Sequence, residues 1–396
     1  MAQDISATNL ATNWAADGQQ VTFTVEMDWA RSGSWTDETA YVLNVQCATS
    51  IYDRALGLPA LGETSPSRAT IRLKNDTNRF SPDKGTIAAI ADGIYRVPVR
   101  VSAGYVDGTN GAETLRQFTG EIEAAKEAET VGGKVVVCEC VDSGVALLQY
   151  KHTTEMYTDQ RADQFLDTLC TAAGITSTSL ERGFIEIPYC WTDTENLWSE
   201  FVKVAAAEGG LLFFGKDGTL NFWRLTHLLE AADSTTSQVT LARSGAVELA
   251  NDASWRNAYT KVEVESNPWL RGPITNLYEA EAELIVEPGQ TITHWARLRY
   301  VATDIIEPVS GVDYNAVSSG MMDLSGDLTI TMTAYAQQAK LELTNANAAQ
   351  AVYVLDLVLR GYPLIGEQAD KDEYEQTLTP PKVPGEKVNT VSGNHF

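Results

Sequence analysis

The feature that most constrains this fold is the alternation of apolar and polar residues in short runs that end at turn-forming residues. In RATIRLK (68–74), Ala69, Ile71 and Leu73 fall on one face of an extended segment and polar residues fall on the other. This pattern is typical of a strand with one buried face. The next residues, NDTNRFSP, supply Asn and Asp for a turn and a proline that cannot donate to a sheet. We therefore predict a strand followed by a turn.

Similar runs occupy the first 150 residues, and glycine-rich segments such as DGTNG (107–111) suit tight hairpins between them. They predict an antiparallel meander that curls into a barrel or a sandwich over residues 1–150. The runs are VTFTVEMDW (21–29), AYVLNVQC (40–47), YRVPVRVSAGYV (95–106), LRQFTGEIEAAKEAE (115–129) and KVVVCECVD (134–142).

Residues 151–225 change to helical periodicity and predict a small helix-helix-hairpin unit. The first helix has an apolar stripe that ends before Gly174. A second helix is expected to start at Thr192-Asp-Thr-Glu195, which has the spacing of a capping box, and LLFF, GKDG and TLNFW (211–223) predict a hairpin. The stripe of the first helix consists of Ala162, Phe165, Leu166, Leu169, Cys170 and Ala173.

Residues 226–366 return to strand patterns and predict a second barrel-like domain, followed by a polar C-terminal tail at 367–396. The fold class is therefore mainly β (α+β), with two barrel-like antiparallel β domains joined by the small unit. The predicted strands are QVTLA (238–242), YTKVEVES (259–266), LYEAEAELIVE (277–287), HWARLRYVA (294–302), DLTITMTAYA (327–336), KLELTN (340–345) and AVYVLDLVLRGYPL (351–364).

Charge and hydropathy exclude several classes of protein. The 396 residues carry a formal net charge of −24, which repels phosphate backbones and argues against tight nucleic-acid binding. No apolar run has the length of a membrane span, and the N-terminal segment lacks the pattern of a signal peptide. The five cysteines have no framework spacing, so we expect a reduced protein made in a cytoplasm.

The sequence predicts no metal, no cofactor and no catalytic site. Cys138 and Cys140 would share one strand face, but two further zinc ligands are missing, which favours buried thiols. The four histidines are scattered, and no nucleophile elbow, P-loop or HExxH helix occurs. A pair of glycosidase carboxylates remains open among the 53 acids. The nine tryptophans also leave a sugar-binding role open, although core or interface positions are the simpler interpretation.

Glutamates recur at every second residue in three segments, which would place each set on a single strand face. Intervening residues such as Ile122 and Ala282 are expected to face the interior. A solvated strand face is one interpretation. The other is an acidic wall, repeated by symmetry around a channel, along which a polyanion passes without adhering. The glutamates are Glu121, Glu123, Glu263, Glu265, Glu279, Glu281 and Glu283.

Several segments, in order, resemble the tail-tip or baseplate hub proteins of tailed bacteriophages and the related minor tail proteins of long-tailed phages. The resemblance covers most of residues 20–365. It is carried by WTDETAYVLNVQC (35–47), RATIRLKNDTNRFSP (68–82), VPVRVSAGY…RQFTGEIE (97–123), ADQFLDTLCTAAGI and AAAEGGLLFFGKDGTLNF in the middle unit, and SWRNAYTKVEVES and LTN…VLDLVLRGYPL later.

This resemblance implies two barrels per chain and a homotrimer that forms a ring of six barrels at the end of the tail tube. It implies a structural, non-enzymatic virion protein with a distal tube-ring protein, a tape-measure protein and fibre or spike proteins as partners. DNA would pass through without specific binding. Arg79, Phe80, Ser81 and Pro82 would then fix a strand exit at a barrel edge, with the phenylalanine buried and the arginine paired with an acid. The alternative is a β-rich protein that binds or cleaves glycans on a host surface.

Overall fold

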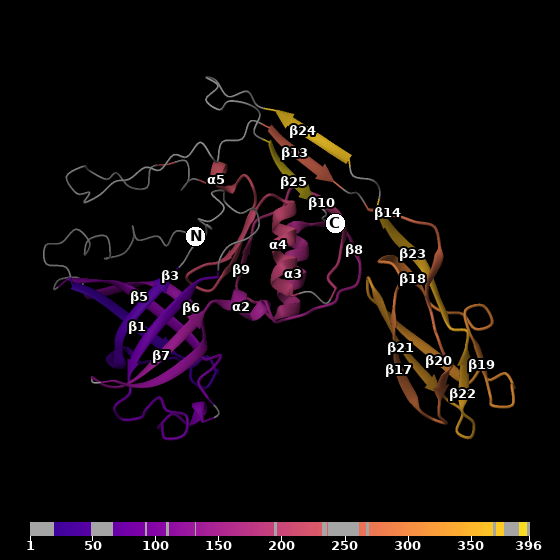
Figure 1. The fold of residues 1–396 in the computed structure, drawn as a ribbon, viewed down its shortest axis with the longest axis horizontal. Helices are drawn as coiled ribbons and strands as arrows, with labels where there is room; N and C mark the ends of the chain where they lie inside the picture. Colours follow the sequence, from indigo (N-terminus) through magenta and orange to yellow (C-terminus); the bar gives the residue numbers. More distant parts are fainter. Residues whose placement is uncertain are drawn as a thin grey trace. The chain divides into compact units, whose positions relative to one another are not determined.

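The structure, a computed structural model, describes residues 20–48, 66–91, 93–107, 111–130, 132–193, 196–231, 236, 261–266, 269–366, 370–375 and 388–393. The chain divides into two compact units (Figure 1). The first comprises Met1–Tyr150, Leu166–Phe184 and Asn196–Ala253, and the second comprises Lys151–Phe165, Ile185–Glu195 and Ser254–Phe396. The predicted mainly β fold class is confirmed. The predicted four-part division stays a prediction, because residues 151–225 contribute to both units.

A strongly curled seven-stranded sheet forms most of the first unit (Figure 1). Its strand order is β2-β1-β5-β6-β7-β4-β3, so the meander β5-β6-β7 is flanked by strands from earlier in the chain. The two ends of the sheet, β2 and β3, are joined by the short helix η1 (Thr39–Tyr41). The strands are β1 (Gln20–Met27), β2 (Thr36–Asp37), β3 (Val42–Ala48), β4 (Arg68–Lys74), β5 (Pro98–Asp107), β6 (Gly111–Thr130) and β7 (Gly133–Val141).

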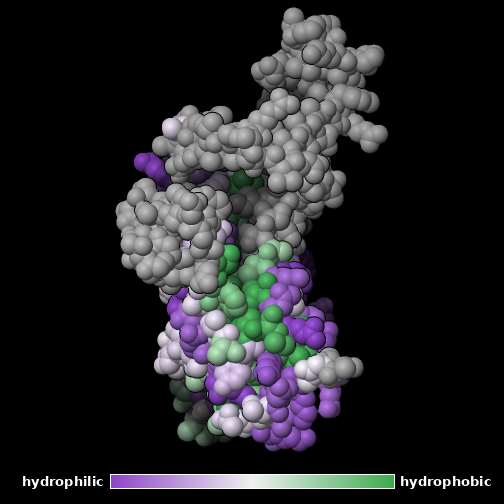
Figure 2. All heavy atoms as spheres, turned by 90° about the vertical axis from the view of Figure 1, so that its left-hand side faces the viewer, coloured by the Kyte–Doolittle hydropathy of each residue, from purple (hydrophilic) through white to green (hydrophobic). Residues whose placement is uncertain are grey.

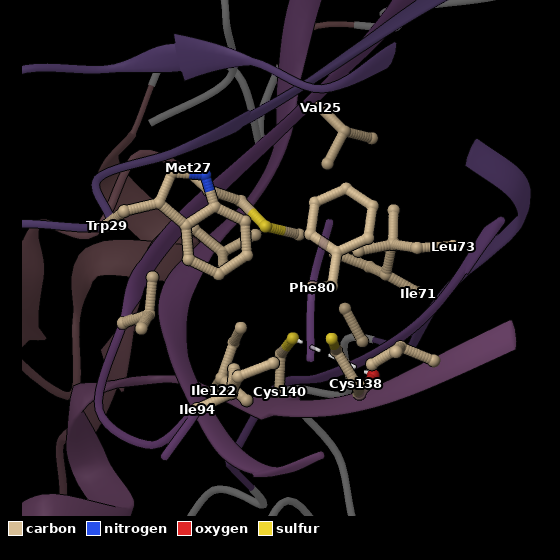
Figure 3. Close-up of a cluster of buried hydrophobic side chains, with 14 of the residues drawn as sticks. Val25, Met27, Trp29, Ile71, Leu73, Phe80, Ile94, Ile122, Cys138 and Cys140 are labelled. Carbon is tan, nitrogen blue, oxygen red and sulfur yellow. Dashed lines mark hydrogen bonds between the residues drawn. The ribbon is translucent and has the colours of Figure 1, made fainter. Parts of the chain in front are cut away.

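The inner face of this sheet encloses a core in which aromatic side chains pack against β-branched and sulfur-containing ones (Figure 3). The predicted alternation of β4 is observed, because Ala69, Ile71 and Leu73 are buried and the residues between them are exposed. Other members of the core are Val25, Met27, Trp29, Phe80, Ile90, Phe118, Ile122, Cys138 and Cys140.

The remaining elements of the first unit pack as a small α/β layer. The hairpin β11 (Leu211–Phe214) and β12 (Leu220–Trp223) is confirmed, and β9 (Thr178–Leu180) adds to it in parallel. Helix α2 (Ser143–Leu147) is capped by Asp142, and the short helix α5 (His227–Glu230) follows β12. Helix α3 (Ala162–Ala173), which both units share, ends at Gly174 as predicted, with φ of 71°.

The predicted start of the second helix is wrong. Helix α4 (Leu197–Ala207) begins after Asn196, whose side chain accepts a hydrogen bond from the Ser199 amide at 2.8 Å. Thr192 is instead buried, and its hydroxyl donates to the carbonyl of His152 at 2.8 Å. The capping-box spacing therefore selected a residue that fixes a loop and does not cap the helix.

The second unit contains several short sheets instead of one long sheet. Strands β8 (Tyr157–Arg161) and β10 (Glu186–Cys190) pair with each other. Three further sheets enclose an aliphatic core that includes Leu277, Leu341 and Leu343. Their strands are β14 (Trp269–Arg271), β15 (Thr275–Glu279), β16 (Leu284–Val286), β17 (Thr291–Arg297), β18 (Ala302–Ile306), β19 (Asn315–Val317), β20 (Leu328–Ala334), β21 (Gln338–Asn345), β22 (Val352–Leu355) and β23 (Val358–Gly366).

Three predicted strands of this region are interrupted. The chain bends at 280–283, leaves the strand at 298–301, and turns at Asp356 with φ of 53°. Residues 367–396, predicted as a polar tail, contain β24 (Asp370–Glu375) and β25 (Val388–Gly393), which pair with the two edges of β13 (Lys261–Ser266). Backbone pairing needs no apolar face, so these strands left no alternation in the sequence. The predicted strand 238–242 lies outside the described residues.

Candidate functional site

The turn after β4 is fixed by a buried aromatic and ion-pair cluster. Phe80 is fully buried, and its ring centroid lies 5.6 Å from that of Trp29 and 5.4 Å from that of Tyr41. Arg79 donates two hydrogen bonds to the Glu38 carboxylate, at 2.6 and 3.2 Å. The burial of the phenylalanine and the pairing of the arginine with an acid are both as predicted from the sequence.

Glu38 is the residue of this cluster that sequence reasoning missed. It has no exposed surface, and the Trp29 indole nitrogen also donates to it at 2.9 Å. The hydrogen bonds to Glu38 raise the pKa of Arg79, because they favour the charged guanidinium. Glu38 lies between β2 and η1, so the ion pair ties the exit of β4 to the segment that joins the two ends of the sheet. The only signal in the sequence is its position next to the Trp-Thr-Asp segment at 35–37.

The other two residues of the predicted signature complete the turn. Ser81 is buried, and its hydroxyl donates to Glu127 at 3.0 Å and accepts from Asn75 at 3.1 Å. The Asn75 side chain also accepts from the Phe80 amide at 2.9 Å, and Pro82 follows half-buried. This is the turn chemistry that Asn and Asp side chains supply. The contacts are structural, and the role of the turn at an interface stays a prediction.

As far as the described residues show, the curled sheet of the first unit is open between β1 and β3. No described strand pairs with β3 on the edge away from β4, or with β1 between Gln20 and Thr24 on the edge away from β5. An apolar groove of about 390 Å³ lies there, and Figure 2 shows hydrophobic side chains gathered in a band over this side. Its lining includes Phe23, Leu43, Asn44, Val45, Cys47, Val101, Ala103 and Gln117.

The first pair of predicted channel-lining glutamates does not form a simple alternating row. A β-bulge between Ile122 and Ala124 places Glu123 out of register, where it is exposed. Glu121 is half-buried and forms an ion pair with Arg96 at 3.2 Å. Ile122 lies in the core as expected. Of this pair, Glu123 alone offers an exposed carboxylate.

The third set of glutamates lies partly outside a strand. Glu279 ends β15, whereas Glu281 and Glu283 lie in the bend before β16, and all three are exposed. Glu279 is 3.5 Å from Arg299 in an ion pair. The expected interior position of Ala282 is wrong, because this residue is exposed. Glu263 and Glu265 lie on β13, where the backbone alone is described.

A cavity of about 480 Å³ lies beside this bend, and Glu279, Glu281 and Arg297 are among its lining residues. In its wall the Tyr278 hydroxyl and the His294 Nε2 atom are 2.7 Å apart. Burial raises the pKa of Tyr278 and lowers the pKa of His294. Burial thus favours the neutral form of both groups, and their hydrogen bond fixes the position of the Tyr278 side chain on β15 against β17.

The thiol groups are poorly suited to metal binding. Cys138 and Cys140 are buried, and burial raises the pKa of Cys138 to about 12 and the pKa of Cys140 well above its ordinary value. A metal requires the thiolate, which this environment disfavours. In the part of the chain that the structure describes, no group of three or more His, Cys, Asp or Glu residues could hold a metal ion. None of the described helices is long and apolar enough to cross a membrane.

Comparisons with known proteins give no sequence match and several structural ones. No family model matches the chain, and no curated protein does. The chain is similar to a 43 kDa tail protein of the prophage MuSo2 from Shewanella oneidensis, with a TM-score of 0.39 and 13% identity over 61% of this chain and 66% of that one, slightly less than two thirds.

A tail protein from Neisseria meningitidis gives a TM-score of 0.39 and 9% identity, over 85% of this chain and 96% of that one. A component of the type VI secretion system of Escherichia coli, described as structurally similar to T4 bacteriophage tail proteins, gives 0.31 and 9%, over 85% and 77%. Solved phage tail proteins are thus among the structures that this chain resembles, and the overlap of the folds is partial.

Proposed function

We propose that this chain is a structural virion protein, a trimeric tail-tip or baseplate hub that closes the distal end of a phage tail tube. The ordered resemblance of segments between residues 20 and 365 supports this role. The two β-rich regions, at 1–150 and 226–366, would supply two quasi-equivalent barrels per chain, so that three chains form a ring of six. The unit at 151–225 and the segment 367–396 would complete the protomer.

The open side of the first sheet is the observation that carries the proposal. Unpaired strand edges are templates for pairing with another chain, and proteins that leave them bare risk aggregation. Here both edges flank an apolar groove on a chain whose net charge is −24. Phe23 is 39% exposed and Leu43 is 54% exposed. A neighbouring copy that covers these residues and pairs with an edge would remove both liabilities.

The remaining partners follow from the position of such a ring. One face would bind the distal tube-ring protein and the tape-measure protein, and the other would bind fibre or spike proteins. The protein would be made in the host cytoplasm and would act in the virion during host cell entry. Its role in DNA ejection would be mechanical. The exposed glutamates Glu123, Glu279, Glu281 and Glu283 are the strongest candidates for the wall of the DNA passage.

The trimer is tested by native mass spectrometry and sedimentation of the purified full chain. We expect trimers or rings for the wild type and monomers for Phe23→Asp/Leu43→Asp, because two charges in the groove oppose its burial. Leu148→Asp is the matched control, since Leu148 is a leucine of the same unit that is 44% exposed outside the groove. A wild-type chain that stays monomeric at high concentration would contradict the proposal.

The acidic passage is tested separately. In assembled particles, Glu279→Lys/Glu281→Lys/Glu283→Lys should slow DNA ejection while assembly survives, because a cationic wall retains a polyanion. The residues are exposed, so the folded state should tolerate the change. Normal ejection kinetics with this variant would remove these residues from the passage and leave the hub assignment standing.

A further inference from the structure

Trp295 is the described tryptophan with the largest exposure. It is 51% exposed on β17, whereas Trp29 and Trp198 are buried and Trp35, Trp191, Trp223 and Trp269 are half-buried. The indole is stacked with the ring of Tyr335, with centroids 6.0 Å apart and planes inclined by 29°. An aromatic pair held in this way is a rigid platform with apolar faces and polar edges.

The sheet face around this pair is polar. Strand order β17-β21-β20 places Lys340 beside Trp295 and Thr333 beside Lys340. The next row consists of Thr293, Glu342 and Thr331, and the third consists of Thr291, Thr344 and Thr329. The threonines of β17 and β20 in these rows are exposed. An apolar partner would bury these hydroxyls without hydrogen bonds, which costs free energy. The face therefore suits a ligand that carries many hydroxyl groups.

The charges beside the platform indicate the sign of that ligand. Lys340 and Glu342 neutralise each other through an ion pair at 2.7 Å. Arg297 follows Trp295 on the same face of β17, is exposed, and has no ion-pair partner among the residues that the structure describes. Because Lys340 is neutralised, Arg297 is the guanidinium that this face presents to a ligand, and it also lines the cavity of Glu279 and Glu281. Guanidinium groups bind carboxylates through paired, charge-assisted hydrogen bonds.

We propose that the outer face of β17-β21-β20 binds a saccharide that carries a carboxylate. One pyranose ring stacks on Trp295 and Tyr335, its carboxylate binds Arg297, and its hydroxyls bond to the threonine rows. A combination of aromatic surface with a few placed polar groups is the general composition of small-ligand sites. This binding function is additional to the hub role and does not depend on it. It assigns to one surface the sugar binding that the tryptophan content left open.

Titration of the purified full chain with a matched pair of probes tests the site. The probes are trigalacturonate and its methyl ester, which differ in charge but not in ring structure, and the signals are tryptophan fluorescence and saturation-transfer NMR. We expect the acid to bind roughly tenfold more tightly than the ester, as a charge-assisted pair requires. Trp295→Ala should weaken binding by roughly tenfold or more, which is typical of a stacking anchor. Arg297→Gln should bind acid and ester equally.

Two control variants separate the site from general effects. Phe184→Ala removes an aromatic ring of the first unit that is 57% exposed and lies under the Arg224 guanidinium at 4.3 Å. Arg182→Gln removes an exposed charge of that unit. Both should bind like the wild type. The proposal is overturned if neither probe binds, if the ester binds as tightly as the acid, or if Trp295→Ala binds normally while its thermal melt shows a folded protein. None of these outcomes bears on the trimer.

Discussion

The two β-rich regions of this chain enclose their cores in different ways. In the first unit one seven-stranded sheet curls around a core that includes Trp29, Phe80 and Phe118. In the second, three sheets of at most four strands enclose a core of Leu, Val, Ala and Ile residues, and Tyr314 is the one buried aromatic residue of that described core. The curled sheet thus encloses large aromatic rings, whereas the second core is filled mainly by aliphatic side chains.

The two regions nevertheless share two structural features. Each region has a buried carboxylate paired with a partly exposed arginine: Glu38 with Arg79, and Asp313 with Arg360 at 3.0 Å. Each also has a glycine where strands approach too closely for a side chain, at Gly120 and Gly361. The carboxylate–arginine pair and the close approach at a glycine therefore recur in both regions, although the cores differ. Variants that destabilise one region and leave the other unchanged test whether each region depends on its own contacts.

The largest expected effect is at the aromatic core. Phe80→Ala should destabilise the first unit by about 4 kcal/mol, because a fully buried ring leaves a cavity that the curled sheet cannot fill. Leu343→Ala in the second core should cost about 3 kcal/mol. Hydrogen exchange resolved by peptide reports each unit separately. Faster exchange in both regions after either substitution would show that the cores are not independent.

The next largest effects on stability are expected at the two ion pairs that have a buried carboxylate. Arg79→Leu should cost about 3 kcal/mol, because Glu38 is left as a buried charge to which, among the described residues, the Trp29 indole still donates. Arg360→Leu should cost less. Its side chain is 35% exposed against 26% for Arg79, and Asp313 keeps the Val309 amide at 2.9 Å. Chemical denaturation monitored by peptide-resolved exchange measures both. Glu38→Met combined with Arg79→Leu should recover part of the loss, and a double variant as unstable as Arg79→Leu alone would argue against a stranded charge.

Local periodicity made the strands of the first region and helix α3 predictable from the sequence. The predicted meander is wrong for the whole sheet, because β1 and β4 flank the three consecutive strands β5-β6-β7. The strands β1, β4, β5, β6 and β7 and the apolar stripe of α3 follow from residues that alternate or repeat within each element. The burial of Phe80 and a partner acid for Arg79 could also be anticipated. The identity of that acid could not, since Glu38 is 41 residues away in the chain.

The predictions that failed depend on contacts between distant segments, which no local sequence pattern contains. The bulge at Glu123 arises from the pairing of β6 with β7, and the bend at 280–283 interrupts a perfect sequence alternation. The pairing of β24 and β25 with β13 uses backbone groups that every residue carries. The exposure of Trp295 could not be predicted for the same reason. The strands that surround a residue determine its exposure, and its neighbours in sequence do not.

A fall in pH should change the stability of the two units in opposite directions. Burial raises the pKa of Asp142 to about 6, so the folded first unit binds a proton before the unfolded chain does, and its stability rises as pH falls from about 6 to about 4. The shift corresponds to at most about 3 kcal/mol. Burial lowers the pKa of His294, so the unfolded chain takes the proton first, and the second unit loses stability as pH falls below about 6.5.

Exchange measured at pH 7, 6 and 5, corrected for intrinsic rates, checks both signs. Asp142→Asn keeps a side-chain acceptor for the α2 cap and should remove the stabilisation of the first unit. His294→Gln should remove the loss in the second. Each variant leaves the other region unchanged, so each serves as the control for its counterpart. A common response of both regions would mean that the general titration of the acidic surface dominates.

The smallest expected effect tests the shared glycines. A Cβ at Gly120 would lie 2.6 Å from Phe118 Cζ and collide with the Val141 carbonyl, and a Cβ at Gly361 would lie 2.6 Å from Leu277 Cδ1 and collide with the Asp304 carbonyl. Backbone cannot move aside as a flexible side chain does, so Gly120→Ala and Gly361→Ala should each cost about 2 kcal/mol. Gly326→Ala, which meets open space, is the control and should be neutral. If Gly120→Ala were as harmless as this control while Gly361→Ala remained costly, the close approach would belong to the second region alone, and the likeness between the two regions would reduce to their ion pairs.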